Sequence, residues 1–164
     1  MRGSLIVGLF LLLGAGCGGS QTPQEMLGEA NKAFTTTKDY DQAITLYKNV
    51  LDWKGEGEPT TQQRFEASFN LARCQVRNKE FDRAVASMEE IQKAFGDTVT
   101  YKNYCTVIVD LVAEKASGDA IDLLGKAKEL YPKYEDQFEK MAEKIKKLDL
   151  SDEEMQKLQS LGYL

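Results

Sequence analysis

The chain has 164 residues, the size of one domain, and its 21 Lys plus Arg against 26 Asp plus Glu give a formal net charge of −5. This acidic balance argues against a nucleic-acid partner, because such binding needs basic side chains that displace counterions from phosphates. The chain has no histidine, the usual general base near neutral pH and the commonest transition-metal ligand. We therefore expect no enzyme, no cofactor and no metal site.

The N-terminus carries the pattern of an export signal. Arg2 precedes an apolar run from Leu5 to Leu13, which is shorter than the roughly 20 residues that a membrane-spanning helix needs. The run ends in small residues directly before Cys17. This arrangement resembles the signal of bacterial lipoproteins, in which the leader is removed and the cysteine is acylated. The resemblance implies a signal peptide at 1–16 and a lipidated Cys17 on a flexible tether at 17–21.

The lipoprotein pattern also implies a location. Several acyl chains on Cys17 form a stable membrane anchor, and the absence of Asp at position 18 favours, by resemblance, the outer membrane facing the periplasm. The alternative is an ordinary secretory leader that is cleaved near Gly16 or Gly19, in which case Cys17 has no special role.

A helical hairpin is predicted after the tether. Thr22 and Glu25 form a capping box that starts its first helix, and Thr35 to Lys38 are predicted to form the turn. The second helix carries small or apolar residues at intervals of four and three, which places them on one face: Ala43, Tyr47 and Val50.

The same face recurs twice further along the chain. The second copy contains Ala84, Met88 and Ile91, and the third contains Ala120, Leu124 and Ala127. The leading alanines lie 41 and 36 residues apart, and a polar insertion at 54–59 explains the longer first interval. This spacing predicts three helical hairpins over residues 22–132.

The first helices of the second and third hairpins have weaker signals. Thr60 and Gln63 form a second capping box, and Gly96-Asp97 is predicted to end one helix and cap the next. The segment from Tyr101 to Leu111 is rich in β-branched residues, so local propensity alone also allows a strand. The repeat register requires a helix there, and we predict one.

The C-terminal part is predicted to contain two more helical segments. Residues 133–149 place Tyr134, Phe138 and Ile145 on an apolar stripe opposite a charged face, as a helix that caps a stack of repeats would do. Residues 150–164 form a short helical tail. The sequence leaves open whether this tail packs on the domain or presents Tyr163 and Leu164 outward.

Residues 22–132 as a whole resemble tetratricopeptide repeats. The resemblance implies an all-α solenoid of about three hairpins plus a capping helix, in which the first helices line a concave groove that binds peptides or folded proteins. Lys38 replaces the glycine that the family has at the hairpin turn. The remaining signature positions are occupied by Leu27, Phe34, Tyr40, Ala43 and Tyr47. We therefore expect a membrane-anchored adaptor or assembly factor.

In that register, one set of positions faces the groove: Lys32, Phe69, Arg73, Val76, Arg77, Lys102 and Val109. The four basic residues among them are predicted to form a strip that suits an acidic segment or a C-terminal carboxylate. Some family members hold a carboxylate with a clamp of Lys and Asn. Asn70 and Lys102 fall on two places of that clamp, but Gly28, Lys32 and Thr106 depart from the other three. The alternative is that these side chains are merely solvated and that Phe69 belongs to the core.

Two features leave further alternatives open. Cys74 and Cys105 fall on neighbouring first helices, where they either form a disulfide or, as we favour, remain two separate buried thiols. The apolar run 107–109 with Leu111 and Val112 motivates a competing function. This is a carrier of a lipid or small apolar ligand, with a cavity between the third hairpin and the C-terminal helices.

Overall fold

A computed structural model describes residues 21–163, so the predicted leader, Cys17, most of the tether and Leu164 lie outside the described residues. Within this range the chain is helical and contains no strand. The eight α-helices are α1 (Pro23–Lys32), α2 (Tyr40–Leu51), α3 (Thr61–Arg77), α4 (Phe81–Phe95), α5 (Tyr101–Ala113), α6 (Ser117–Leu130), α7 (Glu135–Ile145) and α8 (Asp152–Ser160). Short turns of other helical types occupy Ala33–Thr37, Gly96–Thr98 and Pro132–Tyr134.

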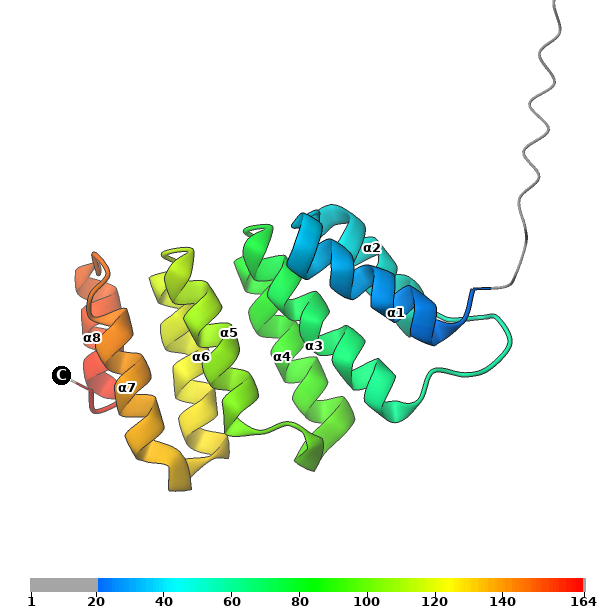
Figure 1. Cartoon of the computed structure of the whole chain (residues 1–164). Helices are drawn as coiled ribbons and strands as arrows, with labels where there is room; N and C mark the ends of the chain where they lie inside the picture. The colour runs from blue at the N-terminus through cyan, green and yellow to red at the C-terminus, as the bar shows by residue number, and fades with distance from the viewer. Residues whose placement is uncertain (1–20, 164) are drawn as a thin grey trace, which may run out of the picture.

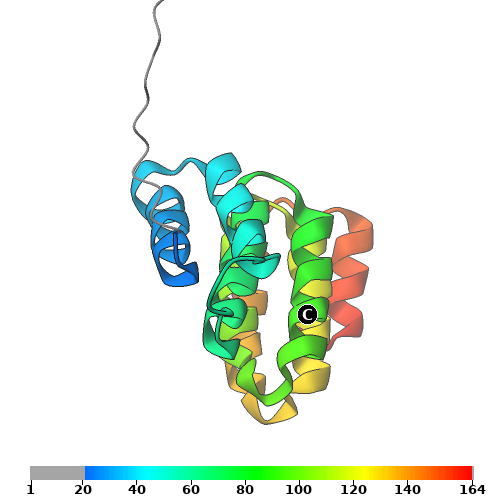
Figure 2. The same cartoon turned by 90° about the vertical axis from the view of Figure 1, so that its right-hand side faces the viewer.

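The helices stack as successive antiparallel pairs (Figure 1). The first helices α3, α5 and α7 form one layer and the second helices α4, α6 and α8 form the other, which Figure 2 shows from the end of the stack. The hairpin of α1 and α2 lies at a clear angle to the rest of the stack, and its α2 packs closely on α3. The predicted all-α solenoid, including the helix at Tyr101–Ala113, is confirmed.

Each of the first three hairpin turns places a lysine in the left-handed region. Lys38, Lys79 and Lys115 have φ of 55°, 61° and 62°. The first turn is shorter than predicted, because Thr35–Thr37 remain helical in a widened turn that begins at Ala33. The hydroxyl of Thr37 donates to the carbonyl of Ala33 and stabilises this segment.

The caps are mostly as predicted. Thr22 with Glu25 and Thr60 with Gln63 form capping boxes at the starts of α1 and α3. The prediction that Asp97 caps α5 is wrong. The chain continues from Gly96 as a short 3-10 turn, and Thr100 is the residue in extended conformation before α5, where its hydroxyl and its backbone N–H donate to Asn103.

The apolar residues form two clusters that meet at α3. The smaller cluster lies between α1, α2 and α3 and includes Ala43, Tyr47 and Cys74. The larger runs from α3 to the C-terminus and includes Met88, Ile108 and Phe138. Helix α3 therefore contributes one side to each cluster, which makes it the central element of the fold.

The C-terminal region forms a fourth, irregular hairpin. The capping helix is shorter than predicted, because Pro132–Tyr134 form a 3-10 turn that leaves Tyr134 exposed. Helix α8 packs along α6, where Ser117 donates to Glu154 and Lys128 donates to the carbonyl of Leu161. Tyr163 is buried, so the described part of the tail packs on the domain.

Candidate partner-binding site

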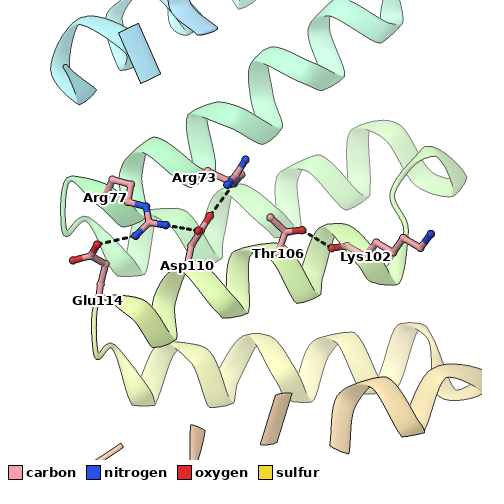
Figure 3. A network of polar contacts seen from close by, with 6 residues as sticks. All are labelled: Arg73, Arg77, Lys102, Thr106, Asp110 and Glu114. Carbon is pink, nitrogen blue, oxygen red and sulfur yellow. Dashed lines mark hydrogen bonds and ion pairs between the residues drawn. The ribbon is translucent and has the colours of Figure 1, made fainter. Parts of the chain in front are cut away.

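The first-helix face, formed by α1, α3, α5 and α7, carries a network of ion pairs between α3 and α5 (Figure 3). Arg73 Nε lies 2.8 Å from one carboxylate oxygen of Asp110, and Arg77 Nη2 lies 2.6 Å from the other. Arg77 Nη1 reaches Glu114 at 2.9 Å. The predicted strip is therefore not a row of free cations, because its two arginines are paired with acidic side chains of the next first helix.

Sequence reasoning missed Asp110 and Glu114. Their spacing of four residues matches that of Arg73 and Arg77, so both pairs lie one helical turn apart on facing helices. Asp110 is only 4% exposed, and a buried carboxylate requires partners of this kind. This matched spacing was the one feature of the sequence that could have indicated the pairing.

The guanidinium of Arg73 is held between two aromatic rings. Its Cζ lies 5.1 Å from the ring centroid of Phe34 and 6.0 Å from that of Phe69, both within the range of cation–π attraction. Arg73 uses Nε for Asp110, and no acceptor among the described residues binds its two Nη groups. The result is an oriented, 27% exposed guanidinium that retains free hydrogen-bond donors.

Phe69 has two roles. Its ring stacks on Phe65 at 6.1 Å with planes 5° apart, and it is partly buried against the larger cluster. It is thus a core residue that also supports the Arg73 guanidinium.

Asn70 belongs to a second polar network, between α1, α2 and α3. The hydroxyl of Tyr47 donates to Asn31 Oδ1 at 2.7 Å, and Asn70 Nδ2 donates to the same oxygen at 3.1 Å. Asn31 Nδ2 donates to Glu66 at 2.8 Å. Burial raises the pKa of Tyr47 well above its usual value, so its hydroxyl stays protonated. This network fixes the first hairpin to α3 and orients the Asn70 amide.

The other predicted residues are more scattered. Lys32 on α1 and Lys102 on α5 are exposed, and the Lys102 side chain points away from the arginines in Figure 3. Val109 is exposed, but the placement of Val76 in the groove is wrong, since its side chain is fully buried. Val76 lies on the side of α3 that faces the larger apolar cluster.

Cys74 and Cys105 are free thiols, as we favour from the sequence, but only Cys74 is buried and Cys105 is half-buried. Cys74 belongs to the smaller cluster, whereas Cys105 packs against the larger one. Burial raises the pKa of Cys74 to about 12 and also raises that of Cys105. Both sulfurs are therefore protonated near neutral pH, and they are poor nucleophiles and poor metal ligands.

Three of the five residues that motivated a carrier function lie in the core, whereas Val109 is exposed and Val112 is half-buried. Val107, Ile108 and Leu111 are fully buried and pack in the larger cluster, which also includes Phe138 and Ile145 of α7.

Within residues 21–163, no group of three or more acidic or cysteine side chains is arranged to hold a metal ion. None of the helices in the described range is both long and apolar enough to cross a membrane.

Stacked antiparallel hairpins with polar networks along their first helices define a helical-repeat solenoid. Residues 35–103, from the end of the first helical segment to the start of α5, match the tetratricopeptide repeat family. This segment therefore carries repeats of the tetratricopeptide type, and α5 to α8 continue the arrangement beyond it. Tetratricopeptide repeats are protein-binding scaffolds. No curated protein and no solved structure matches the chain significantly.

Proposed function

We propose that the protein is a membrane-anchored adaptor or assembly factor of the bacterial cell envelope, whose first-helix face binds a segment of a protein partner. The lipid is attached to Cys17, and the repeats extend from it into the periplasm, most simply from the outer membrane. The anchor concentrates the binding face at the membrane surface, which raises its effective concentration for a partner located there.

The observation that carries the proposal is the environment of Arg73. Asp110 fixes the Nε side of the guanidinium, and Phe34 and Phe69 flank it. The free Nη groups suit a carboxylate of the partner, because Arg forms strong, directional hydrogen bonds with carboxylates. The ordering of this side chain is completed before binding, so a partner loses less free energy in forming the contact.

The surrounding residues support a partner that lies along the face. Lys32 on α1 and Lys102 on α5 are exposed and add positive charge to this face, although the Lys102 side chain points away from the arginines. Since Arg77 uses both Nη groups for Asp110 and Glu114, it stabilises the face and is not expected to contact the partner directly. A segment with one or two carboxylates and apolar groups beside them fits this distribution.

Site-specific photo-crosslinking in cells tests the binding face. A photoreactive residue replaces Lys102, and a matched control replaces Arg83, which lies on the second-helix layer with its side chain 71% exposed. We expect a discrete protein adduct from position 102 and none of the same mass from position 83. Equal adducts from both positions, or none from position 102 in a folded and membrane-bound protein, would reject the proposal.

The anchor is tested separately. Mass spectrometry of the N-terminal peptide is expected to show an acylated Cys17, and Cys17→Ser is expected to release the protein from the membrane fraction. An unmodified N-terminus that begins near residue 17 or 20 would instead indicate an ordinary secreted protein, without bearing on the binding face.

A further inference from the structure

A second surface lies on the other side of α3. The C-terminal end of α2, the middle of α3 and the last turns of α4 surround a cleft of ≈ 320 Å³. Both apolar and polar side chains line it. The lining consists of Leu51, Arg64, Ser68, Leu71, Ser87, Glu90, Ile91, Ala94 and Phe95.

The cleft follows from the angle of the first hairpin. Second helices pack on one another along the rest of the stack, α4 against α6 and α6 against α8. The first hairpin, connected through the loop at 52–60, is turned away, so α2 does not continue this row (Figure 1). Leu51 and Leu71 pack with the smaller apolar cluster, while Ile91 and Phe95 pack with the larger one. The cleft therefore lies at the seam between the two clusters and exposes apolar area from both.

This surface is distinct from the first-helix face. At 100° per residue, the α3 positions that line the cleft (64, 68 and 71) point nearly opposite to positions 66, 70, 73 and 77. One molecule can thus use both surfaces at once.

The two charged side chains that line the cleft differ in whether they are already paired within the chain. Arg64 is committed within the chain, since its guanidinium donates to the carbonyl of Leu51 at 3.0 Å and pairs with Glu58 at 2.7 Å. Glu90 is exposed and has no ion-pair partner among the described residues. Because the Glu90 carboxylate is available, an occupant of this cleft is expected to carry a complementary basic group.

We propose that this cleft binds an amphipathic helix of a protein partner. The helix inserts one or two large apolar side chains, such as Leu or Phe, into the seam and places a Lys or Arg opposite Glu90. Insertion of an apolar helix face into a groove between helices is an established mode of recognition. This second docking surface is independent of the proposed function of the first-helix face. Together they allow the protein to bridge two partners.

A library of displayed helical peptides tests this inference. Each 16-residue peptide has a randomised face on an Ala and Gln scaffold. The library is selected on the full-length protein in detergent and counter-selected on Ala94→Trp, which fills the cleft from an exposed position. We expect enriched peptides that combine two apolar residues four apart with a Lys or Arg within one turn.

The enriched peptides are then measured against matched variants. Binding is expected to weaken at least about tenfold in Ala94→Trp and severalfold in Glu90→Lys. It should be unchanged in Ala86→Trp, another exposed α4 position, which does not line the cleft. Peptides that bind Ala94→Trp as well as they bind the wild type, or that carry acidic residues instead of basic ones, would overturn the proposal. Self-association of the wild type that Ala94→Trp abolishes would also overturn it, because a second copy would then be the occupant.

Discussion

Arg73 of α3 and Asp110 of α5 form an ion pair with Nε and Oδ2 2.8 Å apart, and this contact joins the second hairpin to the third on the first-helix face. The other oxygen of Asp110 binds Arg77, so one buried carboxylate orients both arginines. The geometry of the candidate site and the stacking of these two hairpins therefore depend on the same side chain.

Asp110→Asn is expected to lower the free energy of unfolding by about 1–3 kcal/mol. The amide preserves the shape but leaves the part-buried Arg73 guanidinium without a counter-charge and Arg77 with Glu114 alone. The measurement is urea denaturation, with Asp136→Asn on the exposed face of α7 as the control. A loss below about 0.5 kcal/mol would mean that the ion pairs are not required for stacking.

The network of Asn31, Tyr47 and Asn70 is expected to show coupling. Tyr47→Phe removes one hydrogen bond and should cost about 1 kcal/mol. Asn31→Ala should cost about 2 kcal/mol, because it leaves the Tyr47 hydroxyl and the Asn70 amide without their common acceptor. The double variant is expected to lose less than the sum in a denaturation cycle. Strict additivity would contradict a shared network.

The three left-handed lysines offer a stabilising change. Replacing Lys38, Lys79 or Lys115 with Gly is expected to raise the free energy of unfolding by about 0.5–1 kcal/mol each, because glycine adopts positive φ without steric cost. The effects should add, since the turns are in different hairpins. Lys48→Gly, inside α2, is the control and should lower stability by about 1 kcal/mol. A lower free energy of unfolding in the turn variants would show that the lysine side chains themselves stabilise the turns.

Asp119 gives a prediction about pH. Burial, followed by the nearby Asp82, raises the pKa of Asp119 even though it lies in the first turn of α6, where a carboxylate is ordinarily favoured. A carboxyl with a raised pKa in the folded state holds its proton there more tightly than in the unfolded chain. Its ionisation therefore costs stability as the pH rises above the ordinary value of about 3.9.

Asp119→Asn should remove this cost. We expect the variant to be more stable than the wild type at pH 7 and equally stable near pH 3, where both states of the wild type are protonated. Asp149→Asn, an exposed position, controls for the change in net charge. Equal stability at both pH values would show that the backbone hydrogen bond of Asp119 and the nearby Lys157, which both favour the charged carboxylate, compensate for its burial.

The spacing of apolar residues predicted the features that are determined within a single helix. The buried faces at Ala43, Ala84 and Ala120 were found in this way. The repeat register correctly assigned the segment from Tyr101 to Leu111 as helical against its local propensity, and the observed helix extends to Ala113. The prediction of Asp97 as a cap failed because Asp97 lies within a 3-10 turn and Thr100 occupies the cap position of α5.

Relations between hairpins were harder to predict. The pairing of Arg73 and Arg77 with Asp110 and Glu114 depends on how α3 and α5 are aligned, which the apolar pattern of either helix does not specify. The burial of Val76 and the angle of the first hairpin could not be predicted for the same reason, since both depend on how neighbouring helices are aligned. The family resemblance indicated which helices form the face, but not that ion pairs cross it.

The most direct test of the central claim is the affinity of the partner segment captured at position 102 for variants of Arg73. Isothermal titration of that segment into the wild type, Arg73→Gln, Arg73→Lys and the control Arg83→Gln is performed on samples shown to be folded by circular dichroism. We predict binding at least about tenfold weaker for Arg73→Gln, partly restored for Arg73→Lys and unchanged for Arg83→Gln. Equal affinity for the wild type and Arg73→Gln would contradict recognition through the Arg73 guanidinium.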